Sequence, residues 1–299
     1  MSIHQLGYIR AEATPAAFAE WESYLTDLLI FASVRVEDGE IRVQVDRNAS
    51  RVTIAQGPSD DILAMGWDAG TRAEWLELLE RAKEWGLDPQ VADETTAANR
   101  QVLELFSVSD PNGMGHEIFY GPMTDDPRNL DRRMIGAFLA GDVGIGHAAV
   151  LTTTDSYRAS IEFFRDFLGL VESGRRESDP AVATPISMFR CNARQHSLAV
   201  VPWRKEGGKR LAHFAIEFTQ LDYLGRSYDA AHARNVVKGS LGRHQADNTV
   251  SYYAATPSGY EVEIGWDSRM VEADAGTELF RAYKTPSIWG HHRTDNHDH

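Results

Sequence analysis

Residues 211–218 read LAHFAIEF, an apolar run with the length and composition of a β-strand. Because side chains alternate across a strand, His213 shares one face with Ala215 and Glu217. A helical pattern follows directly, with an apolar stripe formed by Leu221, Leu224, Tyr228 and Ala231. A strand followed by an amphipathic helix predicts one part of an α+β module.

The segment upstream of this stretch begins in the same way. Residues 147–151, HAAVL, form a predicted strand that starts with His147, and Asp155 is a candidate N-cap for the next helix. That helix ends at Gly169, a residue typical of helix C-termini, and its apolar stripe consists of Tyr157, Ile161, Phe164 and Leu168. A Pro-x-Gly turn and the strand YEVEIGW at 260–266 close this half of the chain.

The first half of the chain repeats this order. Thr14 and Pro15 are typical of an N-cap and a first helical position, and the stripe behind them consists of Phe18, Trp21, Leu25 and Leu28. Thr71 and Glu74 form a candidate capping box for a second helix. A Pro-x-Gly turn at 110–113 then precedes the strand HEIFYG. Since order, residue type and spacing all agree, the chain contains two copies of one unit.

The repeat predicts the domain organisation. We expect an α+β protein with two tandem domains, 1–135 and 136–290, each a pair of βαβββ modules that form a curved, barrel-like mixed sheet. The charged connection at about 123–143 is expected to contain a short helix. The polar tail 291–299, which holds four of the eleven histidines, is expected to be disordered.

The composition and charge of the chain argue against several classes of function. The chain has 299 residues, of which 42% are apolar and 25% charged, as in folded globular proteins. A formal net charge of −14 without a basic stripe argues against nucleic-acid binding. The sequence shows neither an apolar run long enough to span a membrane nor a secretory signal pattern, which predicts a cytoplasmic protein with no membrane partner. The single cysteine, Cys191, excludes an intrachain disulfide.

The two copies differ at three equivalent strand positions. The second half carries His147, His213 and Glu263, where the first half carries Gly7, Gly66 and Glu117. Two neutral imidazoles and one carboxylate suit a divalent first-row metal of the non-haem Fe(II) type, because that set leaves coordination positions open. A single histidine in an apolar strand is more often a hydrogen-bonded core residue, so the hypothesis depends on the three positions together.

The second half also resembles a known family. The segments that carry the likeness are 141–155, QHSLAVVP (195–202), LAHFAIEF, SIWGH (287–291) and the specific block GRHQADNTVSYYAATPSGYEVEIGW (242–266). They resemble the two-domain extradiol ring-cleavage dioxygenases of the vicinal-oxygen-chelate superfamily, which include enzymes acting on bicyclic catechols such as 2,3-dihydroxybiphenyl. The resemblance implies a metal-free N-terminal domain, a catechol and O2 as substrates, and homo-oligomers, including octamers. It also implies Fe(II), rather than Mn(II), held by His147, His213 and Glu263.

Four further positions match by resemblance. His196 corresponds to a distal histidine on the oxygen side of the site, and Tyr253 to a tyrosine that hydrogen-bonds a substrate oxygen. His244 matches a histidine near the catechol and Asp247 the acid after it, whereas Ala246 departs from the asparagine of close relatives. The resemblance thus implies catalytic and substrate-binding roles for His196, His244 and Tyr253, and a substrate-binding role for Asp247. Ala149 and Met188 are candidates for setting substrate width, but they match no tight motif.

Two other functions stay open at this point. A ligand-sequestering protein of the same superfamily would bind without metal, and would not need the two histidines and the glutamate together. A glyoxalase-type isomerase uses a more carboxylate-rich ligand set, often shared between modules, which Gly7 and Gly66 cannot supply. The remaining candidates are interpreted as structural or surface residues: His4, His116, His232 and Cys191.

Overall fold

The computed structural model describes residues 3–177, 184–272 and 280–294. In the first half the elements are β1 (Gln5–Ala13), α1 (Pro15–Leu28), β2 (Ser33–Glu37), β3 (Glu40–Gln44), β4 (Val52–Gln56), β5 (Ile62–Asp68), α2 (Arg72–Glu84), β6 (Gln90–Val91), α3 (Glu94–Asn99), β7 (Val102–Ser109) and β8 (Gly115–Pro122). Short 3-10 turns, η1 (Pro127–Asn129) and η2 (Gly141–Val143), lie in the connection, where the sequence predicts a short helix.

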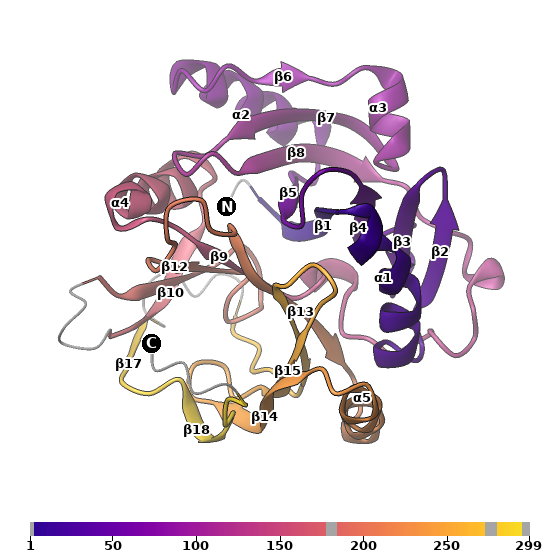
Figure 1. Cartoon of the computed structure of the whole chain (residues 1–299). Helices are drawn as coiled ribbons and strands as arrows, with labels where there is room; N and C mark the ends of the chain where they lie inside the picture. Colours follow the sequence, from indigo (N-terminus) through magenta and orange to yellow (C-terminus); the bar gives the residue numbers. More distant parts are fainter. Residues whose placement is uncertain (1–2, 178–183, 273–279, 295–299) are drawn as a thin grey trace.

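The second half continues with β9 (Ala148–Leu151), α4 (Thr154–Glu162), the π-helical turn η3 (Phe163–Phe167), β10 (Val171–Arg176), β11 (Ile186–Arg190), β12 (Leu198–Val201), β13 (Leu211–Phe218), α5 (Leu221–Ala233), β14 (Val237–His244), β15 (Val250–Ala255), β16 (Glu261–Trp266), β17 (Arg281–Tyr283) and β18 (Ser287–Gly290). The two halves lie side by side, with the first half in indigo and magenta and the second in orange and yellow (Figure 1).

Each half forms one sheet, and the two sheets have equivalent topologies. The strand order is β2-β3-β4-β1-β5-β8-β7-β6 in the first and β17-β10-β11-β12-β9-β13-β16-β15-β14-β18 in the second. In both, the central strands of the two modules pair antiparallel, β1 with β5 and β9 with β13. Parallel pairs flank them, so each sheet is mixed and each half is a pair of βαβββ modules, as predicted. The sheets divide the chain between β8 and β9, and the predicted 135/136 boundary falls in this connection.

The helix ends test the local sequence predictions. The capping box of Thr71 and Glu74 is present at α2, with both reciprocal hydrogen bonds formed. At α1, Thr14 is the N-cap residue, although its side chain does not bond the helix and instead donates to Asp60. The prediction that Asp155 caps α4 is wrong. Thr153 occupies that position and its hydroxyl accepts from Ser156 N, because the helix begins two residues earlier than the carboxylate suggested.

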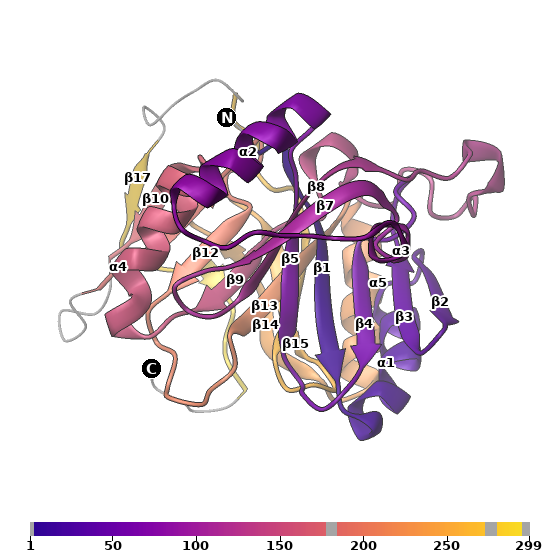
Figure 2. The same cartoon turned by 90° about the horizontal axis from the view of Figure 1, so that it is seen from above.

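A shared apolar core joins the two halves. Buried side chains from both sheets and from the helices belong to one contiguous cluster. Helix α1 packs against α5, and both can be followed beside one another in the view from above (Figure 2). Trp21 of α1 is fully buried, and its ring centroid lies 5.8 Å from that of Tyr260 in the second half. Its indole N–H donates to Ser258 Oγ at 2.9 Å.

Asp60 and Asp61, in the loop before β5, form hydrogen bonds to the start of the strand that carries His213 and to the turn before the strand that carries Glu263. Asp61 accepts hydrogen bonds from the backbone N–H groups of Arg210 and Leu211, at 2.8 and 3.1 Å, where β13 begins. Its neighbour Asp60 accepts from Ser258 Oγ at 3.1 Å, in the turn that leads into β16. The first half therefore anchors the ends of two adjacent strands of the second sheet.

Near the C-terminus the chain follows β14. Thr294 N donates to the Lys238 carbonyl at 3.0 Å, and Arg293 pairs with Glu261 at 2.9 Å. Residues 295–299, in the segment predicted to be a disordered tail, lie outside the described residues. Among the described residues, no helix combines the length and hydrophobicity needed to cross a bilayer.

His4, His116, His232 and Cys191, which the sequence analysis interprets as structural or surface residues, lie outside the metal centre. His4 lies at the surface beside Glu74, and His232 contacts Tyr228 edge-to-face on α5. His116 is buried and accepts from the Trp67 indole N–H at 3.0 Å. Cys191 is 3% exposed, and burial raises the pKa of its thiol to about 11.

We expect the change Asp61→Ala to lower the free energy of unfolding by about 1–3 kcal/mol, because it leaves two backbone N–H groups at the start of β13 without their acceptor. Urea unfolding followed by circular dichroism measures this loss. The matched control is Asp229→Ala on the exposed face of α5, where the change should stay within about 0.5 kcal/mol. Equal stability losses in the two variants would contradict the anchoring role of Asp61.

Candidate metal centre and active site

Three neighbouring strands bring the predicted metal ligands together. His147 immediately precedes β9, His213 lies in β13 and Glu263 lies in β16. β13 pairs antiparallel with β9 and parallel with β16, and the register sets His213 opposite Ala149 and Ala215 opposite Glu263. The sheet order therefore places the three side chains next to one another, although more than a hundred positions of the sequence separate the first from the last.

Their donor atoms form a nearly equilateral triangle. His147 Nε2 lies 3.1 Å from His213 Nε2 and 3.1 Å from Glu263 Oε2, and the third edge measures 3.2 Å. A metal with bonds of about 2.2 Å separates two donors at right angles by about 3.1 Å, whereas a tetrahedral angle separates them by about 3.6 Å. The triangle therefore fits one face of an octahedron, which leaves three adjacent positions for other ligands.

The charge state of these groups also favours a cation. Burial alone would raise the pKa of Glu263, but His244 and the hydrogen bonds from the surrounding histidines hold it well below its usual range. Burial lowers the pKa of His213, although the nearby carboxylate opposes this shift. The two imidazole nitrogens and the carboxylate oxygen lie within 4.8 Å of one another, and a divalent cation could replace the hydrogen-bonding protons between them.

The second carboxylate oxygen of Glu263 is held by the protein. Ser251 Oγ donates to Oε1 at 2.6 Å, and His244 Nε2 lies 3.0 Å from the same atom. Ser251 is itself contacted by His291, whose Nε2 lies 3.1 Å from its hydroxyl. Since Oε1 is engaged in this way, Oε2 alone is free for a metal, and Glu263 is arranged as a monodentate ligand.

A cavity of about 120 Å³ opens over the triangle. Its wall is mostly apolar and includes Ala149 and Met188, together with Ile186, Ala199, Val201 and Ala246. His196, His244 and Tyr253 enter it around the triangle, and the lining also includes Arg176, Asp247, Tyr283, Thr285 and Pro286. This mostly apolar lining with a few convergent polar groups is typical of a pocket for a small, largely apolar ligand.

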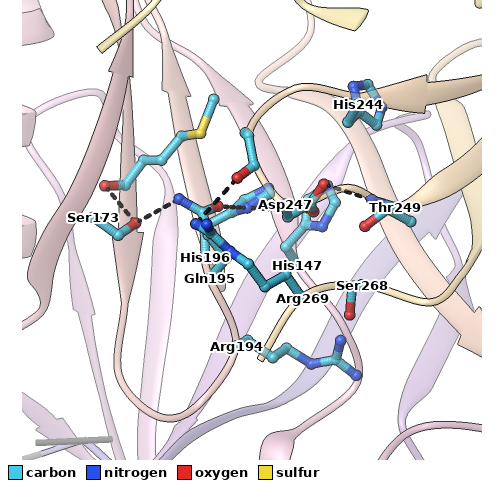
Figure 3. Close-up of polar contacts among 12 residues, drawn as sticks. His147, Ser173, Arg194, Gln195, His196, His244, Asp247, Thr249, Ser268 and Arg269 are labelled. Atoms are coloured by element: carbon cyan, nitrogen blue, oxygen red, sulfur yellow. Dashed lines mark hydrogen bonds and ion pairs between the residues drawn. The ribbon is translucent and has the colours of Figure 1, made fainter. Parts of the chain in front are cut away.

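His196 and Asp247 lie on one side of the triangle. The His196 ring is 9% exposed, and its centroid lies 4.2 Å from that of His147. Its Nδ1 donates to Gln195 Oε1 at 2.7 Å, as Figure 3 shows, while Asp247 Oδ2 is 3.8 Å away. Burial and the neighbouring His147 lower the pKa of His196 to about 3, so the ring is neutral. The Gln195 contact places the single ring proton on Nδ1 and leaves the Nε2 lone pair free.

His244 and Tyr253 lie on the other side. His244 Nδ1 donates to the Pro286 carbonyl at 3.0 Å, and its Nε2 lies 2.9 Å from the Tyr253 hydroxyl. Burial disfavours the charged imidazole, but attraction to Glu263 outweighs it and raises the pKa of His244 to about 9. Burial and Glu263 raise the pKa of Tyr253 well above its ordinary value, which keeps the phenol protonated. A positive imidazole and a neutral phenol thus face the cavity together.

The equivalent positions of the first half are closed. A side chain at Gly66 would begin 2.4 Å from the Tyr8 ring, and one at Gly7 would begin 2.4 Å from the Phe119 ring. Glu117 accepts from the Tyr8 hydroxyl at 2.5 Å and pairs with Arg100 at 3.1 Å. The carboxylate is retained, yet a phenol and a guanidinium satisfy it in place of a metal.

The comparisons with known proteins agree with this geometry. Residues 144–264 match the Glyoxalase/Bleomycin resistance protein/Dioxygenase superfamily. The chain is 33% identical to biphenyl-2,3-diol 1,2-dioxygenase of Metapseudomonas furukawaii, over 97% of this chain and 94% of that protein. It is 31% identical to an iron-dependent extradiol dioxygenase of Rhodococcus jostii, over 97% of both chains. The chain belongs to the extradiol dioxygenase family.

The fold agrees with that of solved family members. The crystal structure of 2,2',3-trihydroxybiphenyl 1,2-dioxygenase from Sphingomonas wittichii strain RW1 matches with a TM-score of 0.86 at 24% identity, and covers 98% of this chain and 100% of that one. This likeness confirms the predicted pair of two-module domains with curved mixed sheets.

Several polar residues of this extradiol dioxygenase were not predicted from the sequence. Gln195 and Ser251 contact His196 and Glu263, but neither residue type carries a signal of its own in a strand or loop. Their nearness in sequence to His196 and Tyr253 was the one available indication. His291 lies in the segment predicted to be a disordered tail, and only the folded chain places its ring 4.2 Å from that of His244.

We expect the change Glu263→Gln to abolish tight binding of a divalent first-row metal, because the neutral amide removes the charge that two neutral imidazoles require. The matched control is Glu261→Gln, two residues earlier in the same strand, where the carboxylate pairs with Arg293 outside the triangle. Anaerobic titration with Co(II), followed by its visible absorbance, compares the two variants. Equal affinities would show that the metal binds elsewhere.

Proposed function

We propose that this chain is an extradiol catechol dioxygenase that opens the ring of a catechol beside its two hydroxyl groups and incorporates both atoms of O2. The substrate is a catechol, and a bicyclic one such as 2,3-dihydroxybiphenyl is favoured. The observation that carries the proposal is a facial triangle of His147, His213 and Glu263 beneath a mostly apolar cavity. A named relative that acts on biphenyl-2,3-diol supports the substrate class.

Fe(II) is the proposed cofactor. The donor set suits Fe(II) and Mn(II) alike, and the relative named as iron-dependent favours iron. When bound, iron supplies adjacent coordination positions for the diol and for O2 and a path for electrons between them. The chain's own residues then have three tasks: to orient the catechol, to exclude water around it and to move protons.

His196 is the proposed proton-transfer residue on the oxygen side of the site. Its Nε2 lone pair is free because Nδ1 donates to Gln195, so the ring can accept a proton at Nε2 and return it. Asp247, 3.8 Å from Nδ1, stabilises the imidazolium that forms. Asp247 also lines the cavity and contributes to substrate binding there.

Tyr253 and His244 are proposed to orient the catechol and take up one of its protons. The protonated phenol of Tyr253 can donate to a substrate oxygen, and its 2.9 Å contact with His244 fixes the direction of the hydroxyl. Metal binding at Glu263 weakens the attraction that holds the His244 proton, which makes the imidazole available as a base. Ala246, which departs from the asparagine that the family resemblance implies, presents only a methyl group to the cavity.

The alternative functions fit the structure less well. A metal-free sequestering protein has no use for three donor atoms held 3.1–3.2 Å apart. A glyoxalase-type isomerase would draw further ligands from the first half, where Tyr8 and Phe119 fill the equivalent space.

The test is oxygen consumption by protein reconstituted anaerobically with Fe(II). We expect stoichiometric O2 uptake and a yellow product on adding 2,3-dihydroxybiphenyl, reduced at least about a hundredfold in His213→Ala and unchanged in His232→Ala on α5. Should 2,3-dihydroxybiphenyl, 1,2-dihydroxynaphthalene and a monocyclic catechol all give no uptake with iron-loaded protein, the sequestering function replaces this proposal.

A second prediction concerns Gln195. The change Gln195→Leu removes the acceptor of His196 Nδ1, so we expect kcat to fall about tenfold, with KM and iron content unchanged. Gln195→Glu keeps an acceptor oxygen in place and should retain more of kcat. A Gln195→Leu enzyme with wild-type kcat would show that His196 is oriented without this contact.

Two further points stay predictions. Assembly into homo-oligomers, including octamers, is expected from the family resemblance, and solution mass measured by light scattering decides it. A cytoplasmic location is the other prediction, and cell fractionation with detection of the chain decides it.

A further inference from the structure

The lining of the substrate cavity contains a guanidinium that the described residues leave without a hydrogen-bonding partner. Arg176 is the last residue of β10 and lines the cavity together with Ile186, Met188 and Val201. Its guanidinium carbon lies 5.1 Å from the centroid of the Trp203 ring, which covers one face of the group. Across residues 3–177, 184–272 and 280–294, no hydrogen bond or ion pair engages its N–H groups.

The acidic groups near this cavity are engaged elsewhere. Among the lining residues, Glu263 is held by Ser251 and three histidines. Asp247 accepts from Thr249 N and lies near His196. The neighbouring arginine on the same strand, Arg175, is different, because it pairs with Glu172 at 2.6 Å. Among the described residues, no carboxylate therefore compensates the positive charge that Arg176 brings to a largely apolar wall.

Such a charge in a half-buried apolar wall is unfavourable unless a ligand compensates it. Burial lowers the pKa of Arg176, yet the guanidinium stays protonated at neutral pH. The planar guanidinium can donate two parallel N–H hydrogen bonds to one carboxylate. It can do so while one of its faces stacks on an aromatic ring. The stacking on Trp203 restricts the group and leaves the N–H edge for a ligand.

We propose that Arg176 binds a carboxylate carried by the catechol substrate at the end remote from its two hydroxyl groups. The inference rests on the proposed function, because it takes the diol to lie at His147, His213 and Glu263. The preferred substrate class is then an anionic catechol in which a short apolar spacer, a chain or a second ring, joins the diol ring to the carboxylate. The spacer lies against Ile186, Met188 and Val201.

A neutral second ring is the competing occupant. Such a ring could stack on the Arg176 guanidinium, as Trp203 does on the other side. Stacking would leave the N–H edge without an acceptor, which is why the observations favour the carboxylate. The two occupants make opposite predictions for a pair of substrates that differ only in charge.

The test compares 3-(2,3-dihydroxyphenyl)propanoate with its isosteric amide, and uses 2,3-dihydroxybiphenyl as the neutral reference. With the iron-loaded enzyme we expect kcat/KM for the acid to exceed that for the amide by roughly ten- to a hundredfold. Arg176→Met should remove most of this preference, measured as the ratio of the two kcat/KM values. The matched control is Arg175→Met, which should keep the preference because Arg175 already pairs with Glu172.

Anaerobic titration calorimetry supplies a readout independent of turnover. The acid should bind the wild-type enzyme more tightly than the amide does, and Arg176→Met should equalise the two affinities. Arg176→Lys keeps the charge without the planar fork and should give an intermediate preference. A wild-type enzyme that binds and cleaves the acid no better than its isosteric amide, or an Arg176→Met enzyme that keeps the preference for the acid, would overturn the inference. In either case cleavage of any of the three catechols leaves the proposed dioxygenase function standing.

Discussion

The buried negative charge of Glu263 is the interaction on which the rest of the second domain depends. At 2% side-chain exposure, the carboxylate is stable only because imidazoles and a hydroxyl surround it. That requirement fixes which strands must be neighbours, since β9, β13 and β16 each bring one member of the triangle. It also fixes which oxygen faces the open side, because Ser251 and His244 engage the other one. A cation at the triangle completes the neutralisation that these side chains begin.

Because the chain contains two copies of one unit, the copy without a metal site can stabilise the copy that has one. The first domain retains Glu117 but satisfies it with Tyr8 and Arg100, so its stability does not depend on a metal. It then acts as a support, in which Asp60 and Asp61 hold the turn before β16 and the start of β13. Restoring histidine at Gly7 and Gly66 alone would not recreate a second centre, since aromatic rings occupy the space that those side chains would need.

The sequence predicts the strand and helix pattern, the duplication and the three candidate ligands, because these depend on periodicity and on a comparison between the halves. It does not predict contacts that arise from packing. Thr153 rather than Asp155 caps α4, since neighbouring residues of similar capping ability compete and the backbone decides between them. Arg176 is one of many surface-type arginines in the sequence, and only the pairing of β10 with β11 and β17 brings it to the cavity.

The buried thiol of Cys191 has a consequence for an enzyme that handles oxygen. Oxidants attack the thiolate, and a pKa of about 11 leaves about one thiol in ten thousand ionised at pH 7. Its side chain is also 3% exposed, with Ser197 Oγ at 3.4 Å from the sulfur. Oxidation should therefore spare the Cys191 thiol, and activity lost through oxidation of the bound iron should return with a reductant that restores Fe(II), without any need to repair this cysteine.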